Sequence, residues 1–351
     1  MTCTPQTNAT LSEIADKLAA CDDFVICGHM SPDGDCVGSQ LTLAHALRRL
    51  GKTVTCVLVS NEKLDPTLTF LPGADELVYA GAFRGVCRTF VGVDVPNRER
   101  IGQAAEKLFD KATTTITIDH HAYDTRMSQL AYVDPDSAST TMLVWEVAKL
   151  LGQRKPDGAL PFPGITTDIA QCALCGLMTD TGGFRYQNAD VLSFKAASEM
   201  VSCGAMPSDI AREAFQNRSI PSLKLEALAI DRMEVFADGA CVISWVSFDD
   251  MCALGATKSD SEPLINTLRT VRGAEVACML RDQRSSVKGS LRAKGDVDVN
   301  KIAALFGGGG HKAAAGFTVD LPFHKAYKKV VEALEDAVRE QLGECGQVDA
   351  Q

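Results

Sequence analysis

The first half of the chain alternates short apolar segments with longer segments of helical spacing. Residues 113–118 are rich in Thr and Ile, which suit a buried strand, whereas residues 37–50 carry apolar side chains at helical intervals. Strands that alternate with helices in this way are joined by right-handed crossovers and form a parallel sheet. We therefore predict a sheet whose strands span residues 23–27, 53–59, 90–95 and 113–118.

The character of the sequence changes from Arg232 onward. Strands are predicted over residues 240–246, 275–281 and 286–292, followed by an amphipathic helix over 323–341. A chain of 351 residues is long enough to form two domains. We expect the α/β fold class in three parts: an N-terminal domain, 1–190, with a parallel sheet flanked by helices; a helical linker, 191–231; and a smaller α+β C-terminal domain, 232–351.

Three segments complete the first half. Residues 136–151 predict a helix capped by Asp136 or Ser137, and residues 153–164 are rich in Pro and Gly, which indicates an inserted loop. Residues 168–178 are apolar and we expect them to be helical. The Cys172-x-x-Cys175 pair in that segment could bind zinc or act in redox chemistry, but no second pair lies nearby. Packing in the core is the better interpretation.

Composition narrows the classes of partner. The net charge of −10 argues against a sequence-independent binder of long duplexes, which needs basic surface to displace counterions. Thirteen cysteines, an odd number with several inside apolar runs, indicate a reducing cytoplasm. We expect a cytoplasmic protein without a membrane partner, because no stretch is apolar enough to span a bilayer and no signal peptide is visible. Residues 269–301 hold eight Lys or Arg against four acids, which fits a phosphate site or a solvated face.

Four predicted strand ends in the first half carry acids or histidines. Any one of these groups alone could form a turn or cap a helix. Parallel strands, however, direct their carboxyl ends to one edge of the sheet, where five carboxylates and three imidazoles would then meet. The groups are His29, Asp33 and Asp35; Asp94; Asp119, His120 and His121; and Asp180, after the apolar run 175–178.

This number of like charges at one edge indicates bound cations, because several carboxylates would otherwise be forced to take up protons. Mixed Asp and His ligands suit manganese, iron, zinc or cobalt better than calcium. More than four candidate ligands suggest two metals, which in proteins clamp the attacking and leaving oxygens of a phosphoryl displacement.

A run of four glycines, 307–310, precedes His311 and Lys312 and forms the second strong feature. Such runs are often flexible linkers, but the apolar flanks favour a structured loop whose backbone N–H groups could hold phosphate oxygens. No Gly-Lys-Ser/Thr sequence follows, so the run is not a P-loop. Upstream, Ser290-Leu-Arg292 ends a predicted strand with a guanidinium suited to bidentate phosphate contact.

These motifs resemble those of the DHH phosphoesterase family. His29-x3-Asp33-x-Asp35 is similar to the first family motif, Asp94 to the second, Asp119-His120-His121 to the third and Asp180 to the fourth. Residues 307–316 resemble the glycine-histidine motif of the DHH-associated C-terminal domain. The resemblance covers nearly the whole chain in order. It is greatest to the stand-alone NrnA-type group, which degrades very short oligonucleotides and often dephosphorylates 3′-phosphoadenosine 5′-phosphate.

The resemblance implies a role for each candidate residue. The active site would lie in the cleft between the domains and would hold two divalent ions, most plausibly manganese. One ion would be bound by His29, Asp33 and Asp94, and the other by Asp35, Asp94, His120 and Asp180, with Asp94 bridging. As catalytic residues, Asp119 would orient a histidine, and His121 would face the substrate phosphate or assist the leaving group. The implied substrate-binding residues are Arg100, Ser290, Arg292, Gly308, Gly309, Gly310 and His311, with Arg185 either a substrate contact or a surface residue.

The implied activity is that of a manganese-dependent phosphodiesterase and phosphatase. It would hydrolyse very short oligoribonucleotides to nucleoside monophosphates, and 3′-phosphoadenosine 5′-phosphate to AMP. A rival within the family hydrolyses cyclic di-AMP or its linear product pApA, whereas an inorganic pyrophosphatase would lack the glycine-histidine motif. A non-catalytic nucleotide- or RNA-binding protein is the alternative from another class. The expected partners are short single-stranded RNA or small nucleotides, and a homodimer is a family-level expectation.

Overall fold

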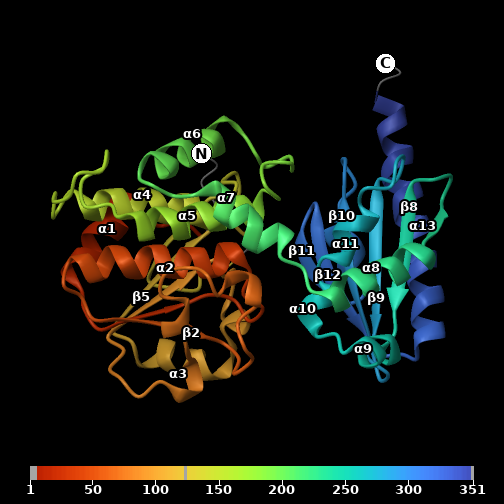
Figure 1. Ribbon diagram of the computed structural model, residues 1–351, viewed down its shortest axis with the longest axis horizontal. Coiled ribbons are helices and arrows are strands. Elements are labelled where there is room, and N and C mark those ends of the chain that lie inside the picture. Colours follow the sequence, from red (N-terminus) through yellow and green to blue (C-terminus); the bar gives the residue numbers. More distant parts are fainter. Residues whose placement is uncertain (1–5, 122–124, 349–351) are drawn as a thin grey trace. The chain divides into compact units, whose positions relative to one another are not determined.

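The structure is a computed structural model that describes residues 6–121 and 125–348. The chain divides into two compact units, Met1–Asn217 and Arg218–Gln351 (Figure 1). Helices α6 and α7 therefore belong to the first unit and α8 to the second. No helix in the described parts of the chain is long and apolar enough to cross a membrane.

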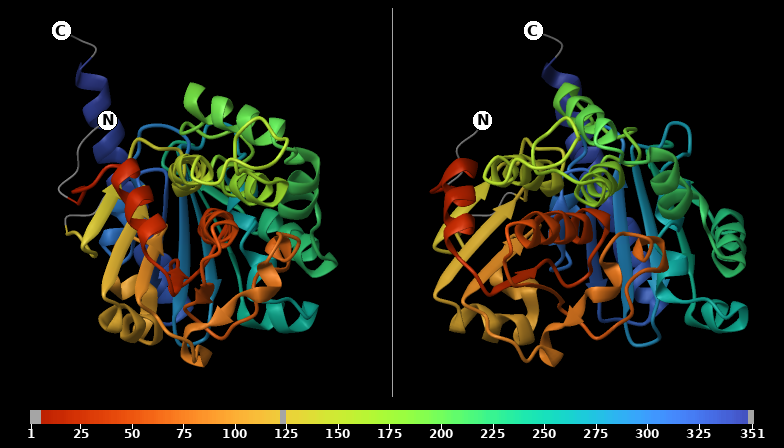
Figure 2. Two further views of the ribbon diagram at one scale, coloured as in Figure 1. Left: turned by 90° about the vertical axis from the view of Figure 1, so that its left-hand side faces the viewer. Right: turned by 60° about the vertical axis from the view of Figure 1, so that its left-hand side comes forward.

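A six-stranded sheet in the order β3-β2-β1-β4-β5-β6 forms the centre of the first unit, and every neighbouring pair is parallel. The prediction of a parallel sheet flanked by helices is confirmed. Strands β5 and β6 lie side by side in both views of Figure 2. Strands β3 and β6 were not predicted, because they are short or only partly buried. The strands are β1 (Phe24–Cys27), β2 (Val54–Leu58), β3 (Val78–Tyr79), β4 (Thr89–Val93), β5 (Thr114–Asp119) and β6 (Leu130–Val133).

Helices cover both faces of this sheet. Alternate strand residues such as Ile26 and Ile118 face a core formed with α1, α2, α4 and α5, whereas Val25 and Phe90 face α3. The helices are α1 (Leu11–Ala20), α2 (Gly34–Arg49), α3 (Gly102–Lys111), α4 (Thr140–Gly152), α5 (Thr167–Asp180), α6 (Val191–Ser202) and α7 (Pro207–Ile210). Shorter turns are the 3-10 helices η1 (Pro66–Leu68), η2 (Ala74–Glu76), η3 (Ala80–Ala82) and η4 (Arg98–Ile101), and the π-helix η5 (Ala211–Gln216).

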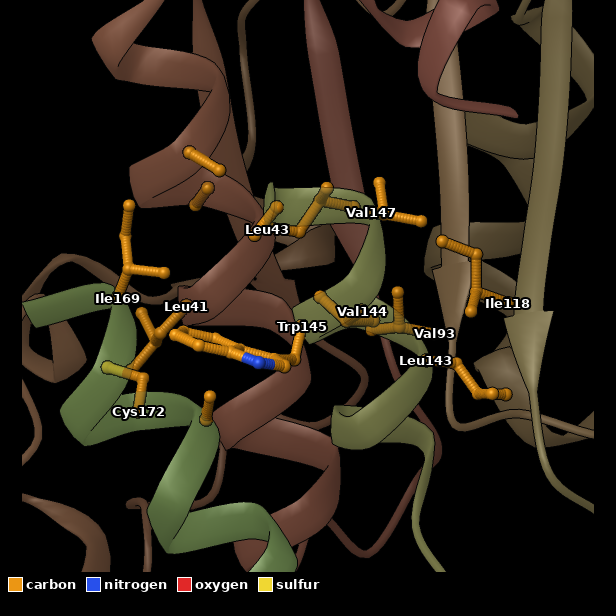
Figure 3. Packing of buried hydrophobic residues seen from close by; sticks show 14 of the residues in the cluster. Leu41, Leu43, Val93, Ile118, Leu143, Val144, Trp145, Val147, Ile169 and Cys172 are labelled. Carbon is orange, nitrogen blue, oxygen red and sulfur yellow. The ribbon is translucent and has the colours of Figure 1, made fainter. Parts of the chain in front are cut away.

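The larger core of the first unit is built around the buried Trp145 of α4. Figure 3 shows its ring near Leu41 of α2 and Cys172 of α5. Helices α2 and α5 approach closely because Gly38 has no side chain: a Cβ there would lie 2.7 Å from the carbonyl oxygen of Cys172. Cys172 is fully buried in this cluster, so the interpretation of Cys172 as a core residue is confirmed.

The second unit contains a mixed six-stranded sheet in the order β11-β12-β10-β9-β8-β7, in which only the β8–β9 pair is parallel. Helices α12 and α13 cover one face, and α8 and α11 pack on the other. The strands are β7 (Glu234–Phe236), β8 (Cys241–Val246), β9 (Val276–Asp282), β10 (Val287–Ala293), β11 (Gly309–His311) and β12 (Ala314–Val319). The helices are α8 (Ile220–Asp231), α9 (Phe248–Leu254), α10 (Lys258–Ser261), α11 (Leu264–Leu268), α12 (Val299–Ala304) and α13 (Phe323–Val348).

Three predictions about local structure were wrong. Asp180 ends helix α5, so counting it among the strand ends was wrong, whereas the helix expected over residues 168–178 is confirmed. Helix α4 begins at Thr140 with Ser139 as its cap, because the Ser139 hydroxyl accepts a hydrogen bond from the amide of Met142. Helix α2 begins at Gly34, three residues earlier than predicted, since the preceding Asp33 already serves as the cap.

Candidate metal centre

The carboxyl edge of the first sheet gathers the predicted metal ligands. His29 follows β1, Asp94 follows β4, and Asp119 is the last residue of β5. Asp94 has a φ of 55°, a left-handed conformation that Asp tolerates better than most side chains, so the chain turns sharply where β4 ends. Helix α5 brings Asp180 to the same edge. The sheet and one helix end therefore build the site together.

Asp94 lies at the centre of this group and is buried. Its Oδ2 lies 3.4 Å from Nε2 of His29, and its Oδ1 lies 3.7 Å from Nε2 of His120 and 3.5 Å from Nδ1 of His121. The two oxygens thus face different sets of potential ligands. This arrangement suits a carboxylate that bridges two cations.

The remaining predicted ligands complete the two sets. Nε2 of His29 lies 3.9 Å from Oδ1 of Asp33. On the other side, Nε2 of His120 lies 3.9 Å from Oδ2 of Asp35 and 4.0 Å from Oδ2 of Asp180. The structure therefore brings together all six residues that the sequence predicts as metal ligands.

The backbone fixes the tautomer of His120. Its Nδ1 lies 3.1 Å from the carbonyl oxygen of Ser137, which can only accept a hydrogen bond, so Nδ1 carries the proton. Its Nε2 then points at Asp35, Asp94 and Asp180. A histidine held in this way by its second nitrogen is typical of a metal ligand.

His29 has a different environment. The amide of Ser31 donates to its Nδ1 at 3.3 Å, so Nδ1 acts as an acceptor in this arrangement. Coordination through Nε2 requires the proton on Nδ1 instead, and this long contact would then open. Metal binding through Nε2 of His29 would therefore require the Ser31 amide to move away from Nδ1.

The second histidine of the Asp-His-His sequence forms a pair with its first residue. Nδ1 of His121 lies 2.8 Å from Oδ1 of Asp119, and the rings of His120 and His121 meet edge to face. The same Oδ1 accepts a hydrogen bond from the amide of His120 at 2.9 Å. Asp119 is buried, and its Oδ2 has no hydrogen-bond partner among the described residues. Asp119 thus holds the ring of His121 and the backbone of His120.

Helix α4 contributes two residues that the sequence analysis missed. The backbone amides of Thr140 and Thr141 donate to Oδ2 and Oδ1 of Asp35 at 2.7 and 2.9 Å, and the Thr141 hydroxyl also donates to Oδ1. The Thr140 hydroxyl donates to Oδ1 of Asp94 at 3.0 Å. The unsatisfied amides at a helix N-terminus are a natural partner for a carboxylate. The run of Ser and Thr at 139–141 was the available signal, because these residues favour helix N-termini.

Asn188 was also missed. Its side-chain amide donates to the carbonyl oxygen of Ala138 at 3.0 Å and to both the backbone oxygen and Oδ2 of Asp180 at 3.2 and 3.3 Å. Asn188 therefore links Asp180 to the segment before α4. No pattern in the sequence distinguishes this Asn from others in loops.

The electrostatics of the cluster favour bound cations. Burial, together with repulsion from Asp94 and Asp180, raises the pKa of Asp35 well above its usual value. Burial also acts to raise the pKa of Asp94, but the hydrogen bond from His29 and the nearby imidazoles hold that pKa below its usual value. Burial opposes protonation of His121, yet the Asp119 carboxylate raises the pKa of His121 to about 10. The carboxylates thus depend on positive charge from their neighbours, which divalent ions would supply.

The donor atoms fit such ions in kind and in spacing. One donor atom from each of Asp35, His120 and Asp180 lies within 4.8 Å of the others, and the same holds for His29, Cys36 and Asp94. Carboxylate oxygens and imidazole nitrogens suit a borderline divalent cation. Cys36 adds a sulfur to the second of these groups, and its thiol pKa is raised by burial and by the charges of Asp94 and Asp33.

The predicted substrate residues of the first unit lie on exposed turns. Arg100 belongs to η4, where its amide donates to the Asn97 side chain. Arg185 follows α5, donates from Nε to the carbonyl oxygen of Gly182, and has its guanidinium carbon 6.0 Å from the centre of the Phe215 ring.

Strand β10 of the second unit carries Ser290 and Arg292 on one face. The hydroxyl of Ser290 accepts a hydrogen bond from Nη1 of Arg281 at 2.8 Å, and Nη1 of Arg292 donates to the carbonyl oxygen of Leu291. The backbone of His311 pairs with that of Ala314 in the β11–β12 ladder.

The glycine run is structured, but it differs from the open loop we predicted. The amides of Gly307 and Gly308 donate to α12 carbonyl oxygens, and the amide of Gly310 donates to Oδ1 of Asn300 at 2.9 Å. The prediction that these three amides are available to phosphate was therefore wrong. Glycine is required at 308 for a packing reason, since a Cβ there would lie 2.2 Å from the carbonyl oxygen of Gly316.

Comparison with known proteins agrees with this architecture. Residues 23–177 match the model of the DHH family N-terminal domain, and residues 239–343 match that of the DHHA1 domain. The chain is 31% identical to the bifunctional oligoribonuclease and PAP phosphatase NrnA of Thermus thermophilus, over 95% of this chain and 94% of the relative. It is 25% identical to the protein of the same name from Bacillus subtilis, over 88% and 93% of the two chains.

A solved structure has the same fold over nearly its whole length. It is the crystal structure of an exopolyphosphatase-related protein from Bacteroides fragilis, with a TM-score of 0.82, 25% sequence identity, and coverage of 96% of this chain and 98% of that one. The family models account for both units, and the relatives are matched almost from end to end. The chain therefore belongs to the DHH family of phosphoesterases, with an N-terminal DHH domain and a C-terminal DHHA1 domain.

Proposed function

We propose that this protein is a manganese-dependent phosphodiesterase that hydrolyses very short oligoribonucleotides to nucleoside monophosphates. We propose 3′-phosphoadenosine 5′-phosphate as a second substrate. The observation that carries the proposal is the central position of Asp94 between two sets of Asp and His donors. The T. thermophilus and B. subtilis relatives, matched over nearly their whole length, bear the names of these two activities.

We assign the two ions to the two sets of ligands. His29, Asp33 and Asp94 would hold one, and Asp35, Asp94, His120 and Asp180 the other. A pair of divalent ions supplies hydroxide near neutral pH and neutralises charge on the phosphoryl oxygens. The protein supplies the geometry: Thr140 and Thr141 hold two of the carboxylates, and the Ser137 carbonyl oxygen fixes the ring of His120.

His121 is the group that we assign to the substrate phosphate or to the leaving oxygen. Its Nδ1 lies 2.8 Å from Oδ1 of Asp119, so the Asp119 carboxylate holds the ring at the edge of the metal cluster. In the second unit we assign phosphate contacts to Ser290 and Arg292 and, from the sequence motif alone, to His311. The amide of Gly309 is not assigned, because Gly309 pairs with Gly316 in the β11–β12 ladder. These groups would bind an anionic oxygen of a short substrate, since a protein with a net charge of −10 is poorly suited to a long polyanion.

The test is a product profile with manganese on four substrates: a ribodinucleotide, a longer RNA, cyclic di-AMP and 3′-phosphoadenosine 5′-phosphate. We expect the dinucleotide to be cleaved fastest, with the bisphosphonucleotide also hydrolysed. Preference for cyclic di-AMP over the dinucleotide would assign the protein to the cyclic-dinucleotide branch instead. The double variant His120→Ala/Asp180→Ala should lose hydrolysis and keep its fold by circular dichroism; undiminished turnover would refute the metal assignment and favour a different site.

A further inference from the structure

A buried arginine on β9 contacts the serine that we assign to substrate binding. Arg281 is 6% exposed, and its donors are directed at two serines. Nε and Nη2 donate to the hydroxyl and carbonyl oxygens of Ser261, both at 2.9 Å, and Nη1 donates to the Ser290 hydroxyl at 2.8 Å. Its nearest carboxylate, Glu262, lies 3.7 Å away and is half exposed, so Arg281 is not neutralised by a buried partner.

Burying this guanidinium is unfavourable, and burial accordingly lowers the pKa of Arg281. A neutral side chain could join β9 to α10 without that penalty. The presence of an arginine is therefore better explained by its planar guanidinium, which can only donate hydrogen bonds and so forces its partners to accept them.

The contact fixes the direction of the Ser290 hydroxyl. An arginine can only donate, so the Ser290 oxygen must be the acceptor, and its own O–H has to serve another group. Within the described residues, no acceptor for that proton is found. Gly316, which lies opposite Ser290 in β12, has no side chain to receive it. The Ser290 O–H is therefore a donor that has no acceptor among the described residues.

We propose that Arg281 is a positioning residue: by occupying the Ser290 oxygen, it makes Ser290 an obligate donor to an anionic oxygen of the substrate phosphate. This inference rests on the proposed function, in which Ser290 binds substrate. With Arg281 in place, the hydroxyl cannot turn its proton toward β9, and its O–H is polarised by the adjacent cation. The serine is therefore prepared for an acceptor such as phosphate before substrate arrives.

A purely structural role makes a different prediction. If Arg281 only tied α10 to the sheet through Ser261, its loss would impair the protein equally whether or not Ser290 had a hydroxyl. If Arg281 acts through Ser290, its loss should have no further effect once that hydroxyl is absent. A double-mutant cycle separates the two.

The experiment uses the full-length, manganese-loaded enzyme and a ribodinucleotide. Ser290→Ala and Arg281→Met should each raise KM on the order of tenfold, with a smaller effect on kcat. The first removes the hydrogen bond from Ser290 to the substrate phosphate, and the second removes the hydrogen bond from Arg281 that directs the Ser290 hydroxyl. The double variant should be no worse than Ser290→Ala within about twofold, and Arg281→Lys should restore part of the affinity. If the rises in KM of the two single variants multiply in the double variant, to roughly a hundredfold, the proposal is overturned.

A milder variant covers the case in which Arg281→Met does not fold. Ser261→Ala removes one of the acceptors that hold Arg281 and leaves its carbonyl oxygen in place. It should raise KM by a few-fold in the parent protein and not at all in the Ser290→Ala background; an equal rise in both backgrounds would contradict the proposal. If the parent protein does not cleave the dinucleotide, the proposed function fails. The same cycle is then measured as the affinity for AMP, where additive losses would refute the role of Arg281 independently.

Discussion

Replacing Thr140 by Val tests whether the N-terminus of α4 positions the metal ligands. The hydroxyl of Thr140 is fully buried and donates to Oδ1 of Asp94 at 3.0 Å. Valine has nearly the same shape, so the variant removes this hydrogen bond and leaves the backbone amide that holds Asp35 in place. The carboxylate that we assign as the bridge between two ions would lose one of its fixed contacts.

The expected loss is in metal affinity more than in stability. Removing a group that orients a metal ligand typically costs about 10–100-fold in metal affinity or activity, equivalent to about 1.4–2.8 kcal/mol. The apparent manganese constant, obtained from initial rates at increasing manganese concentration, should rise by that factor. The rise in melting temperature on adding manganese should shrink in parallel, because weaker binding contributes less to the folded state. Thr140→Ser keeps the hydroxyl and should behave close to the parent.

Thr42→Val is the matched control. Thr42 is also buried, in α2, but its hydroxyl has no hydrogen-bond partner among the described residues. The same chemical change there should leave the manganese constant unchanged and raise the free energy of unfolding by about 1 kcal/mol, since an unsatisfied buried hydroxyl is removed. The reasoning is refuted if Thr140→Val keeps the parent manganese constant within twofold, or if Thr42→Val weakens metal binding as much.

Three other predictions follow from single contacts. Gly176→Ala should abolish most activity and lower the melting temperature, because a Cβ at this position would lie 1.9 Å from the Thr141 hydroxyl and 3.0 Å from Oδ1 of Asp35. Gly51→Ala, where space is open but φ is 77°, should also lower the melting temperature and yet leave metal binding unchanged. Asp250→Asn should lower stability by about 1–2 kcal/mol at neutral pH, because the hydrogen bonds from Arg232 hold the pKa of Asp250 below its usual value. A pKa that is lower in the folded protein stabilises the fold at pH values above the unfolded-state pKa of about 4. The difference in unfolding free energy between parent and variant, measured by urea unfolding, should therefore decrease as the pH falls below 4. A pH-independent difference would exclude this ion pair as its source. Removing bound metal with a chelator should lower the melting temperature of the parent more than that of His120→Ala/Asp180→Ala, which keeps the ligands His29, Asp33 and Asp94 of one proposed ion; equal shifts in both would place the bound metal elsewhere.

The strand ends were predictable from sequence because they depend on local patterns. The runs before His29, Asp94 and Asp119 are apolar and β-branched or aromatic, and a parallel sheet necessarily brings their carboxyl ends to one edge. For Asp180 the sequence supported two conflicting expectations: a helix over residues 168–178, which is confirmed, and a strand end, which is wrong. Both arise because α5 is apolar on nearly all sides, and periodicity over a short run does not separate a buried helix from a buried strand.

The contacts that support the ligands were beyond the reach of sequence patterns. Thr140 meets Asp94 across 46 residues, and Thr141 meets Asp35 across 106. Such pairs are set by how α4 packs beside α2 and not by anything near either residue in the chain. The same holds for Arg281: its sequence neighbours indicate a basic stretch, but only the register between β9 and β10 brings it to Ser290.

The central claim is that Asp94 bridges two divalent ions. The most direct measurement is an anomalous-difference map from crystals of the protein soaked in manganese. The account predicts two peaks about 3.5–4 Å apart, one beside His29 and Asp33 and the other beside Asp35, His120 and Asp180, with Asp94 between them. A single peak, or two peaks that do not share Asp94, would contradict it.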